Sequence, residues 1–233
     1  MSKNPTLLAS TALAAGLFTL SSAALAEPTS ITILHVNDLD QMEDDDGRGG
    51  VAKLAGLIEQ EKANNPNVIV TNGGDAISPS LMSAFDQGAH MIDLYNSVGF
   101  DVMVLGNHEF DFGPDVLEQR IAEAAFPMLG SNAIDEDGEI VDGSVSTWST
   151  TVGDYTIGFL GLTTLGTTVK SSPGTVSFAP LIETAESLAT ELRNGGADLV
   201  IALAHTDISE DRELVDAGVV DMVLSGDDHL LSL

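Results

Sequence analysis

The chain has no cysteine, few basic residues and few large aromatic residues. Its 233 residues include 8 Lys and Arg against 36 Asp and Glu, with one Trp and two Tyr. The absence of cysteine excludes disulfide bonds, a lipoprotein anchor and a zinc site built from thiolates. The formal net charge of −28 disfavours binding to nucleic acid and to anionic membranes. Most of these acidic residues are expected to lie on a solvated surface.

The first 26 residues have the pattern of a secretory signal peptide. Lys3 precedes an apolar run from Leu7 to Leu20, and Ala24-Leu25-Ala26 is a small-residue cleavage sequence. A membrane anchor or an ordinary helix is the alternative, but the apolar run is short. No later segment is long and apolar enough to span a bilayer. We therefore expect a periplasmic or secreted protein without a membrane anchor, folded over residues 27–233.

Short apolar runs alternate with segments of helical periodicity along the rest of the chain. Strands are expected at residues 31–36, 68–71, 102–105, 128–131, 199–204 and 219–224, with a hairpin at 148–162. Helices are expected at residues 50–62, 89–98, 114–125, 182–194 and 210–217, and a polar loop at 135–143. This alternation predicts a layered α/β domain with helices packed on the sheet.

Five of the expected strands run into a turn that carries Asp, Asn or His. The residues in these turns are Asp38 and Asp40, Asp75, Asn107 and His108, His205, and Asp227 with His229. In a largely parallel sheet, all five turns would lie along one edge. Carboxylates gathered there would repel one another unless cations were present, and a mixed Asp, Asn and His set suits divalent metals. One Asp can bridge two such ions and so help to activate water for attack on phosphate.

The most informative stretch is Gly106-Asn107-His108-Glu109-Phe110-Asp111, which follows the apolar run Val102–Leu105. The amide of Asn107 offers a neutral oxygen ligand, and His108 can donate or accept a proton near neutral pH. Asp111 could orient the His108 imidazole. His35, in contrast, lies within an expected strand and is interpreted as a buried structural histidine.

Together these motifs resemble the metallophosphoesterase, or calcineurin-like, domain of the 5′-nucleotidase family, which includes periplasmic UDP-sugar hydrolases. The resemblance covers roughly residues 30–233 and includes Gly49-Gly50-Val51-Ala52 at the start of the first helix. It implies a layered α/β sandwich of mixed sheets flanked by helices. It also implies two divalent metal ions (Mn, Zn, Mg or Co) and hydrolysis of a small phosphate ester, either a nucleotide or a related phosphate ester.

The resemblance further implies a role for each site residue. Asp75 would bridge the two ions. Asp38, Asp40 and His229 would complete one ion's ligands, and Asn107, His205 and Asp227 would complete the other's. His108, paired with Asp111, would stabilise the transition state or protonate the leaving oxygen.

Two motifs depart from the family pattern. The family usually has Asp-x-His in the first motif, where this chain has Asp38-Leu39-Asp40, and Gly-His-x-His in the last, where it has Gly226-Asp227-Asp228-His229. Each ion therefore exchanges one imidazole for a carboxylate. Asp is shorter and harder than His, so the carboxylate either falls short of the ion or favours Mn or Mg over Zn.

The third departure is length. Full-length members of the family continue into a C-terminal domain that binds the nucleoside, so we expect the metallophosphoesterase domain to be incomplete at its C-terminal end. Two alternatives to a 5′-nucleotidase-like hydrolase remain. One is a metal-binding protein with little or no catalysis, and the other is a relative that hydrolyses cyclic nucleotides or sulfur esters.

Overall fold

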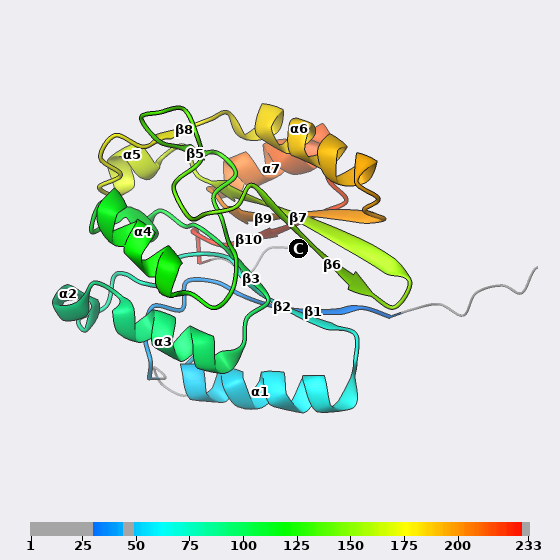
Figure 1. Ribbon diagram of the computed structural model, residues 1–233, viewed down its shortest axis with the longest axis horizontal. Helices are drawn as coiled ribbons and strands as arrows, with labels where there is room; N and C mark the ends of the chain where they lie inside the picture. Colours follow the sequence, from blue (N-terminus) through cyan, green and yellow to red (C-terminus); the bar gives the residue numbers. More distant parts are fainter. Residues whose placement is uncertain (1–29, 44–48, 230–233) are drawn as a thin grey trace, which may run out of the picture.

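The computed structural model describes residues 30–43 and 49–229, so the expected signal peptide at residues 1–26 lies outside the described residues. The principal strands in the described part are β1 (Thr32–Val36), β2 (Val68–Asn72), β3 (Val102–Val104), β4 (Met128–Leu129), β6 (Thr147–Val152), β7 (Tyr155–Thr163), β9 (Leu199–His205) and β10 (Met222–Ser225). The longer helices are α1 (Val51–Asn64), α3 (Ala89–Val98), α4 (Pro114–Glu123), α6 (Leu181–Asn194) and α7 (Ile208–Ala217) (Figure 1).

These strands form two four-stranded sheets. The first has the order β1-β2-β3-β4 and is parallel throughout. The second has the order β10-β9-β7-β6, in which β6 is antiparallel to β7 and the other pairs are parallel. The expected hairpin is therefore the β6–β7 pair, and its strand β7 continues the second sheet into β9.

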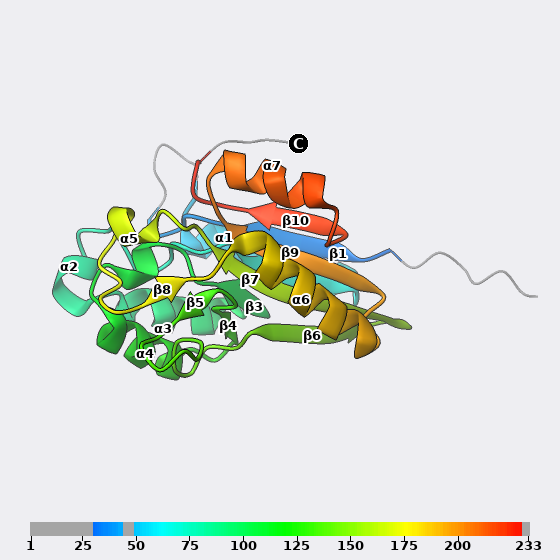
Figure 2. The ribbon, with the colours of Figure 1, turned by 90° about the horizontal axis from the view of Figure 1, so that it is seen from above.

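The hydrophobic residues form three layers of core, because alternate side chains of a strand point to opposite faces. In β2, Ile69 packs between the two sheets, whereas Val70 packs with residues of α1, α3 and α4. In β9, Leu203 packs between the sheets and Ala202 packs with residues of α6 and α7. Figures 1 and 2 show the result, with α1, α3 and α4 on one sheet and α6 and α7 on the other. The expected layered α/β sandwich of mixed sheets flanked by helices is confirmed.

Several short elements of the structure were not predicted from the sequence. They are α2 (Ser83–Asp86), the 3₁₀ turn η1 (His108–Phe110), α5 (Thr167–Lys170), and the small pair β5 (Ala133–Ile134) and β8 (Ser177–Phe178). None is longer than four residues, which is too short to show a hydrophobic period. Across the two described ranges, no helix combines the length and apolar character needed to cross a membrane.

Candidate active site

The residues expected to form the site follow strands of both sheets. Asp38 follows β1, Asp75 follows β2, and Asn107 and His108 follow β3 of the first sheet; His205 ends β9, and Asp227 and His229 follow β10 of the second. The expectation that all five turns share the edge of one parallel sheet is wrong. The β6–β7 hairpin begins a second sheet, and the candidate site lies where the carboxyl ends of the two sheets meet.

Four of these residues have a left-handed backbone, which is uncommon for residues other than glycine. Their φ angles are 54° at Asp38, 56° at Asp75, 79° at Asp227 and 53° at His229. In the described ranges, Gln87 is the one other non-glycine residue with positive φ. Such conformations cost free energy and cluster at functional sites, where the surrounding structure holds them. The strain is therefore concentrated at the candidate ligands.

Glycines allow the turns to approach one another closely. A Cβ atom at Gly106 would lie 2.3 Å from Asp75 Oδ1, and one at Gly74 would lie 2.7 Å from His205 Nδ1. Gly74 also has φ +96°, which side-chain-bearing residues rarely adopt. The two glycines thus bring the turns after β2 and β3 into contact with the end of β9.

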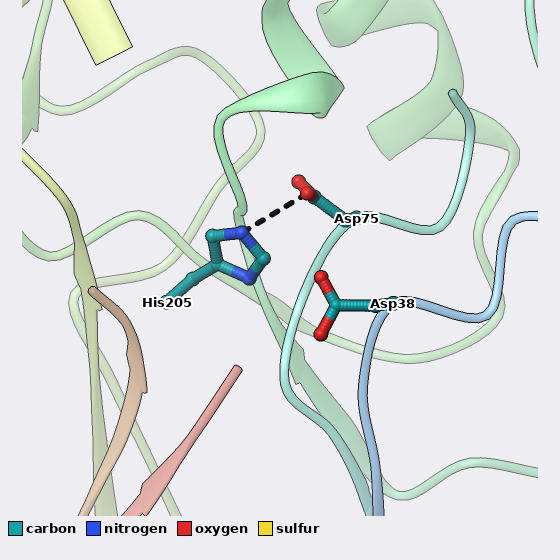
Figure 3. A group of neighbouring side chains, drawn as sticks. All are labelled: Asp38, Asp75 and His205. Carbon is teal, nitrogen blue, oxygen red and sulfur yellow. Dashed lines mark ion pairs between the residues drawn. The ribbon is translucent and has the colours of Figure 1, made fainter. Parts of the chain in front are cut away.

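His205 and two carboxylates converge at the centre of the site. One ligand atom each from Asp38, Asp75 and His205 lies within 4.8 Å of the others, and Figure 3 shows the three side chains directed toward one another. His205 Nε2 is 3.1 Å from Asp75 Oδ2 and 3.5 Å from Asp227 Oδ1, while its Nδ1 is 2.7 Å from the carbonyl of Gly73. Because Nδ1 is hydrogen-bonded to the Gly73 carbonyl, Nε2 is the nitrogen that faces the carboxylates.

The buried amide of Asn107 extends this group. One end of the amide is 3.2 Å from His205 Nε2 and 2.8 Å from Asp227 Oδ1. The amide can turn either its nitrogen or its oxygen to that point. Its nitrogen would donate to Asp227 Oδ1 and, when Nε2 carries no proton, to His205, whereas its oxygen would join these atoms as a third ligand for a cation.

Asp38 connects these residues to an open cavity. Its Oδ1 is buried and accepts no hydrogen bond, but lies 3.3 Å from Nε2 of His229, whose side chain is 73% exposed. The cavity has a volume of about 260 Å³ and is lined by Asp38, Asp40, Gln41, Asp75, Ser78, Pro79, His108 and His229. Burial raises the pKa of Asp40, and the negative charge of Asp75 adds to this shift. The group of atoms within 4.8 Å does not include Asp40, so its ligation stays a prediction.

The expected pair of His108 and Asp111 is present. His108 Nδ1 lies 2.7 Å from Asp111 Oδ2, and this hydrogen bond raises the pKa of His108 to about 8, although partial burial opposes the shift. The backbone N–H of His108 also donates to Asp75 Oδ1 at 2.8 Å. The hydroxyls of Ser78 and Ser171 each donate to the Asp111 carboxylate at 2.7 Å. Asp111 is therefore fixed from three sides and in turn orients the imidazole.

The charge of the carboxylates also acts on His205. Burial alone would lower the pKa of its imidazole, but the hydrogen bonds to Asp227 and Asp75 outweigh burial and raise that pKa well above its ordinary value. An imidazole must be neutral to bind a metal ion through Nε2, so binding at this position would release a proton.

The sequence did not single out Glu109, although it stands inside the most informative stretch. Its carboxylate is fully buried and accepts four backbone N–H groups, from Gly106 and Ala76 at 2.6 Å, Asp75 at 2.9 Å and Ile77 at 3.3 Å. Burial, together with the charge of Asp75, raises the pKa of Glu109 to about 7. Glu109 thus joins the turn after β3 to the turn after β2 and sets the backbone position of Asp75.

We expect Glu109→Gln to destabilise the protein strongly, because the amide nitrogen would face N–H donors that then lack an acceptor. Each buried group left without its partner costs about 1–3 kcal/mol in the free energy of unfolding. Urea denaturation of the two proteins measures the loss. Glu118→Gln, at an exposed position on α4, is the matched control. A midpoint for Glu109→Gln equal to that of the control would contradict the role of Glu109.

The donor set fits divalent metal ions. Close pairs of nitrogen and oxygen atoms link the candidate ligands: His205 with Asp75 and Asp227, Asn107 with His205 and Asp227, and His229 with Asp38. Asp38 Oδ1 is also a buried acceptor without a hydrogen-bond donor. A ligand atom of Asp75 lies within 4.8 Å of one of Asp38 and one of His205. The fold and site together define an α/β protein that gathers candidate divalent-metal ligands at the joined carboxyl ends of two sheets.

Comparison with known proteins agrees with this class. The family model for calcineurin-like phosphoesterases matches residues 31–231. The chain is 32% identical over 227 residues to the snake venom 5′-nucleotidase of Gloydius brevicauda, covering 90% of this chain and 38% of that relative. The chain therefore belongs to the calcineurin-like phosphoesterase family, and it spans less than half the length of the curated relatives that it matches.

Solved structures show the same fold. A 5′-nucleotidase precursor from Thermus thermophilus aligns with a TM-score of 0.78 and 28% identity, covering 86% of this chain and 42% of that one. The NAD nucleotidase of Haemophilus influenzae aligns with a TM-score of 0.77 and 28% identity, covering 86% of this chain and 39% of that one. The resemblance to the 5′-nucleotidase family stated from the motifs is thus confirmed.

Proposed function

We propose that this chain is the metal-binding domain of an exported phosphoester hydrolase that uses two divalent ions to hydrolyse nucleotides or related phosphate esters. The observation that carries the proposal is the position of Asp75 near candidate ligands of both sheets. Its carboxylate is 3.1 Å from His205 Nε2, and its ligand atom lies within 4.8 Å of that of Asp38. The 5′-nucleotidase relatives support the choice of a nucleotide as the substrate.

Each residue then has a role that follows from its position. Asp38, Asp40 and His229 would hold one ion beside the cavity, and Asn107, His205 and Asp227 would hold the other, with Asp75 shared. The ions, when bound, offset the charge on the phosphate and lower the pKa of a water molecule so that it can attack phosphorus. The departures at Asp40 and Asp227 favour Mn or Mg over Zn.

His108 would complete the reaction. Its Nδ1 is held by Asp111, and its ring lines the cavity beside Asp38 and Asp75. The attack of water forms a new P–O bond and breaks the bond to the leaving oxygen, which needs a proton. With its pKa raised to about 8, the His108 ring carries that proton at neutral pH and would donate it to the leaving oxygen or to a phosphate oxygen.

Export is supported by the pattern of residues 1–26, which we propose to be a signal peptide that leaves residues 27–233 as the metallophosphoesterase domain. The net charge of −28 suits a small-molecule substrate brought in with divalent cations rather than a nucleic acid. We propose a periplasmic or secreted location on these grounds.

The proposal is tested by measuring release of inorganic phosphate from adenosine 5′-monophosphate and from p-nitrophenyl phosphate. We expect turnover with added Mn²⁺ or Mg²⁺, a smaller rate with Zn²⁺, and none after chelation. Cyclic adenosine monophosphate, followed by the formation of the nucleoside monophosphate, and a thiosulfate ester, followed by the release of sulfate, distinguish the related hydrolases. Binding of two ions without release of any product would instead identify a non-catalytic metal-binding protein.

A further inference from the structure

Lys170 connects the candidate metal centre to the start of α7. Its Nζ lies 2.7 Å from Asp227 Oδ2 and 3.0 Å from Asp227 Oδ1, and also 2.7 Å from Asp207 Oδ1. Asp207 is the N-cap of α7, where a capping box with Glu210 fixes its backbone and side chain. The ammonium group is therefore held between an anchored carboxylate and a candidate metal ligand.

The Asp227 carboxylate lies between Lys170 and the other candidate ligands. Its Oδ1 is 3.5 Å from His205 Nε2 and 2.8 Å from the amide of Asn107, and its side chain is only 8% exposed. Lys170 contacts Oδ2 at the shorter of its two distances. Oδ1 is 3.0 Å from the ammonium group and also faces His205 and Asn107, so it can ligate an ion while Oδ2 keeps the shorter hydrogen bond to Lys170. Ligating carboxylates usually have such outer partners.

The local charge makes such a partner necessary. Asp227 and Asp75 both contact His205, and the backbone N–H of Asp227 donates to Asp38 Oδ2 at 3.3 Å, so three carboxylates meet here. Asp207 and Asp228 lie beside Asp227 as well. Without a nearby cation, Asp227 would be repelled by Asp38 and Asp75 on one side and by Asp207 and Asp228 on the other.

We propose that Lys170 is a positioning residue for one of the two metal ions, because it holds the Asp227 carboxylate toward His205 and Asn107 and offsets its charge. This role rests on the proposed two-metal function. Exposed ion pairs contribute little, since solvent screens them. The pair here differs, because the Asp227 side chain is only 8% exposed and both of its oxygens contact the same ammonium group.

Calorimetric titration of the metal-stripped protein with Mn²⁺ alone tests this role. We expect two ions to bind the parent chain, and Lys170→Met to weaken one of them by about 10–100-fold while the other binds as before. Lys170→Arg should restore most of the affinity, because a guanidinium group can hold both oxygens of a carboxylate. Lys62→Met is the matched control, since Lys62 on α1 donates to the carbonyl of Gly99.

Each other outcome overturns a distinct statement. Equal affinities in Lys170→Met and the parent would remove Lys170 from the site, and tighter binding would show that the ammonium competes with the ion for Asp227. Equal weakening of both ions, or no rescue by Lys170→Arg, would also contradict a role through Asp227. A parent chain that binds fewer than two ions would overturn the two-metal site itself. Circular dichroism of each metal-free variant verifies that it is folded.

Discussion

Replacing Asp75 with asparagine is expected to reduce the bound metal from two ions to one or none. Asp75 is the carboxylate proposed to serve both ions, because its Oδ2 is 3.1 Å from His205 Nε2 and a ligand atom of Asp75 lies within 4.8 Å of one of Asp38. The substitution removes its charge but keeps its shape. An asparagine at this position could still accept the N–H of His108 through its amide oxygen, so the turn would retain its conformation.

Elemental analysis of dialysed protein and thermal unfolding with and without Mn²⁺ measure the effect. An ion at 100 times its dissociation constant stabilises the folded state by about 2.7 kcal/mol, and Asp75→Asn should lose most of that stabilisation. The metal-free melting temperature should change much less. Asp93→Asn, at an exposed position on α3, is the control and should bind two ions. Equal metal content in Asp75→Asn and the control would contradict the bridging role of Asp75.

His108→Ala is expected to lower kcat by about 10²–10⁴-fold, the usual contribution of a general acid, while the metal content stays unchanged. His108 contacts the candidate ligands through its backbone N–H, which alanine retains, and its imidazole is bonded to Asp111. Loss of the ring therefore removes the proton donor without removing a metal ligand. His90→Ala is the control, because His90 pairs with Asp86 on a different part of the surface.

The pH dependence of kcat tests the same role independently. A general acid must be protonated, so activity should fall as the pH rises through the pKa of His108, which the hydrogen bond to Asp111 raises to about 8. Asp111→Asn weakens that bond and lowers the pKa, so the fall should begin at lower pH and kcat at neutral pH should decrease. A His108→Ala protein that loses metal or keeps full kcat would exclude the catalytic role.

The sequence predicted the long strands and helices because each carries a clear hydrophobic period, and it predicted the candidate ligands because each follows an apolar run. It did not predict that the turns belong to two sheets. The second sheet forms because β7 pairs with β9. The hydrophobic period within a strand does not specify which strand it pairs with, so this pairing could not be predicted.

The supporting residues of the site were missed for a related reason. Glu109 stands in a recognised motif, but only the folded structure shows four N–H groups around its carboxylate. Lys170 and Ser171 lie at the end of α5, an element of four residues, and reach Asp227 and Asp111 across 57 and 60 positions of the chain. Contacts at such separations arise from tertiary packing and leave no local pattern.

The division of the ligands between two sheets has a thermodynamic consequence. In the proposed ligand sets, neither the segment up to Asn107 nor the segment from His205 supplies every ligand of an ion, so tight binding of an ion would require the core between the sheets to be formed. The free energy of binding and the free energy of docking one sheet on the other are therefore linked, and each must strengthen the other by the same amount. On the proposed ligand sets, ion affinity would measure tertiary structure as well as ligand chemistry. A substitution at Phe159, which is buried between the sheets, would then lower ion affinity although Phe159 is not one of the proposed ligands.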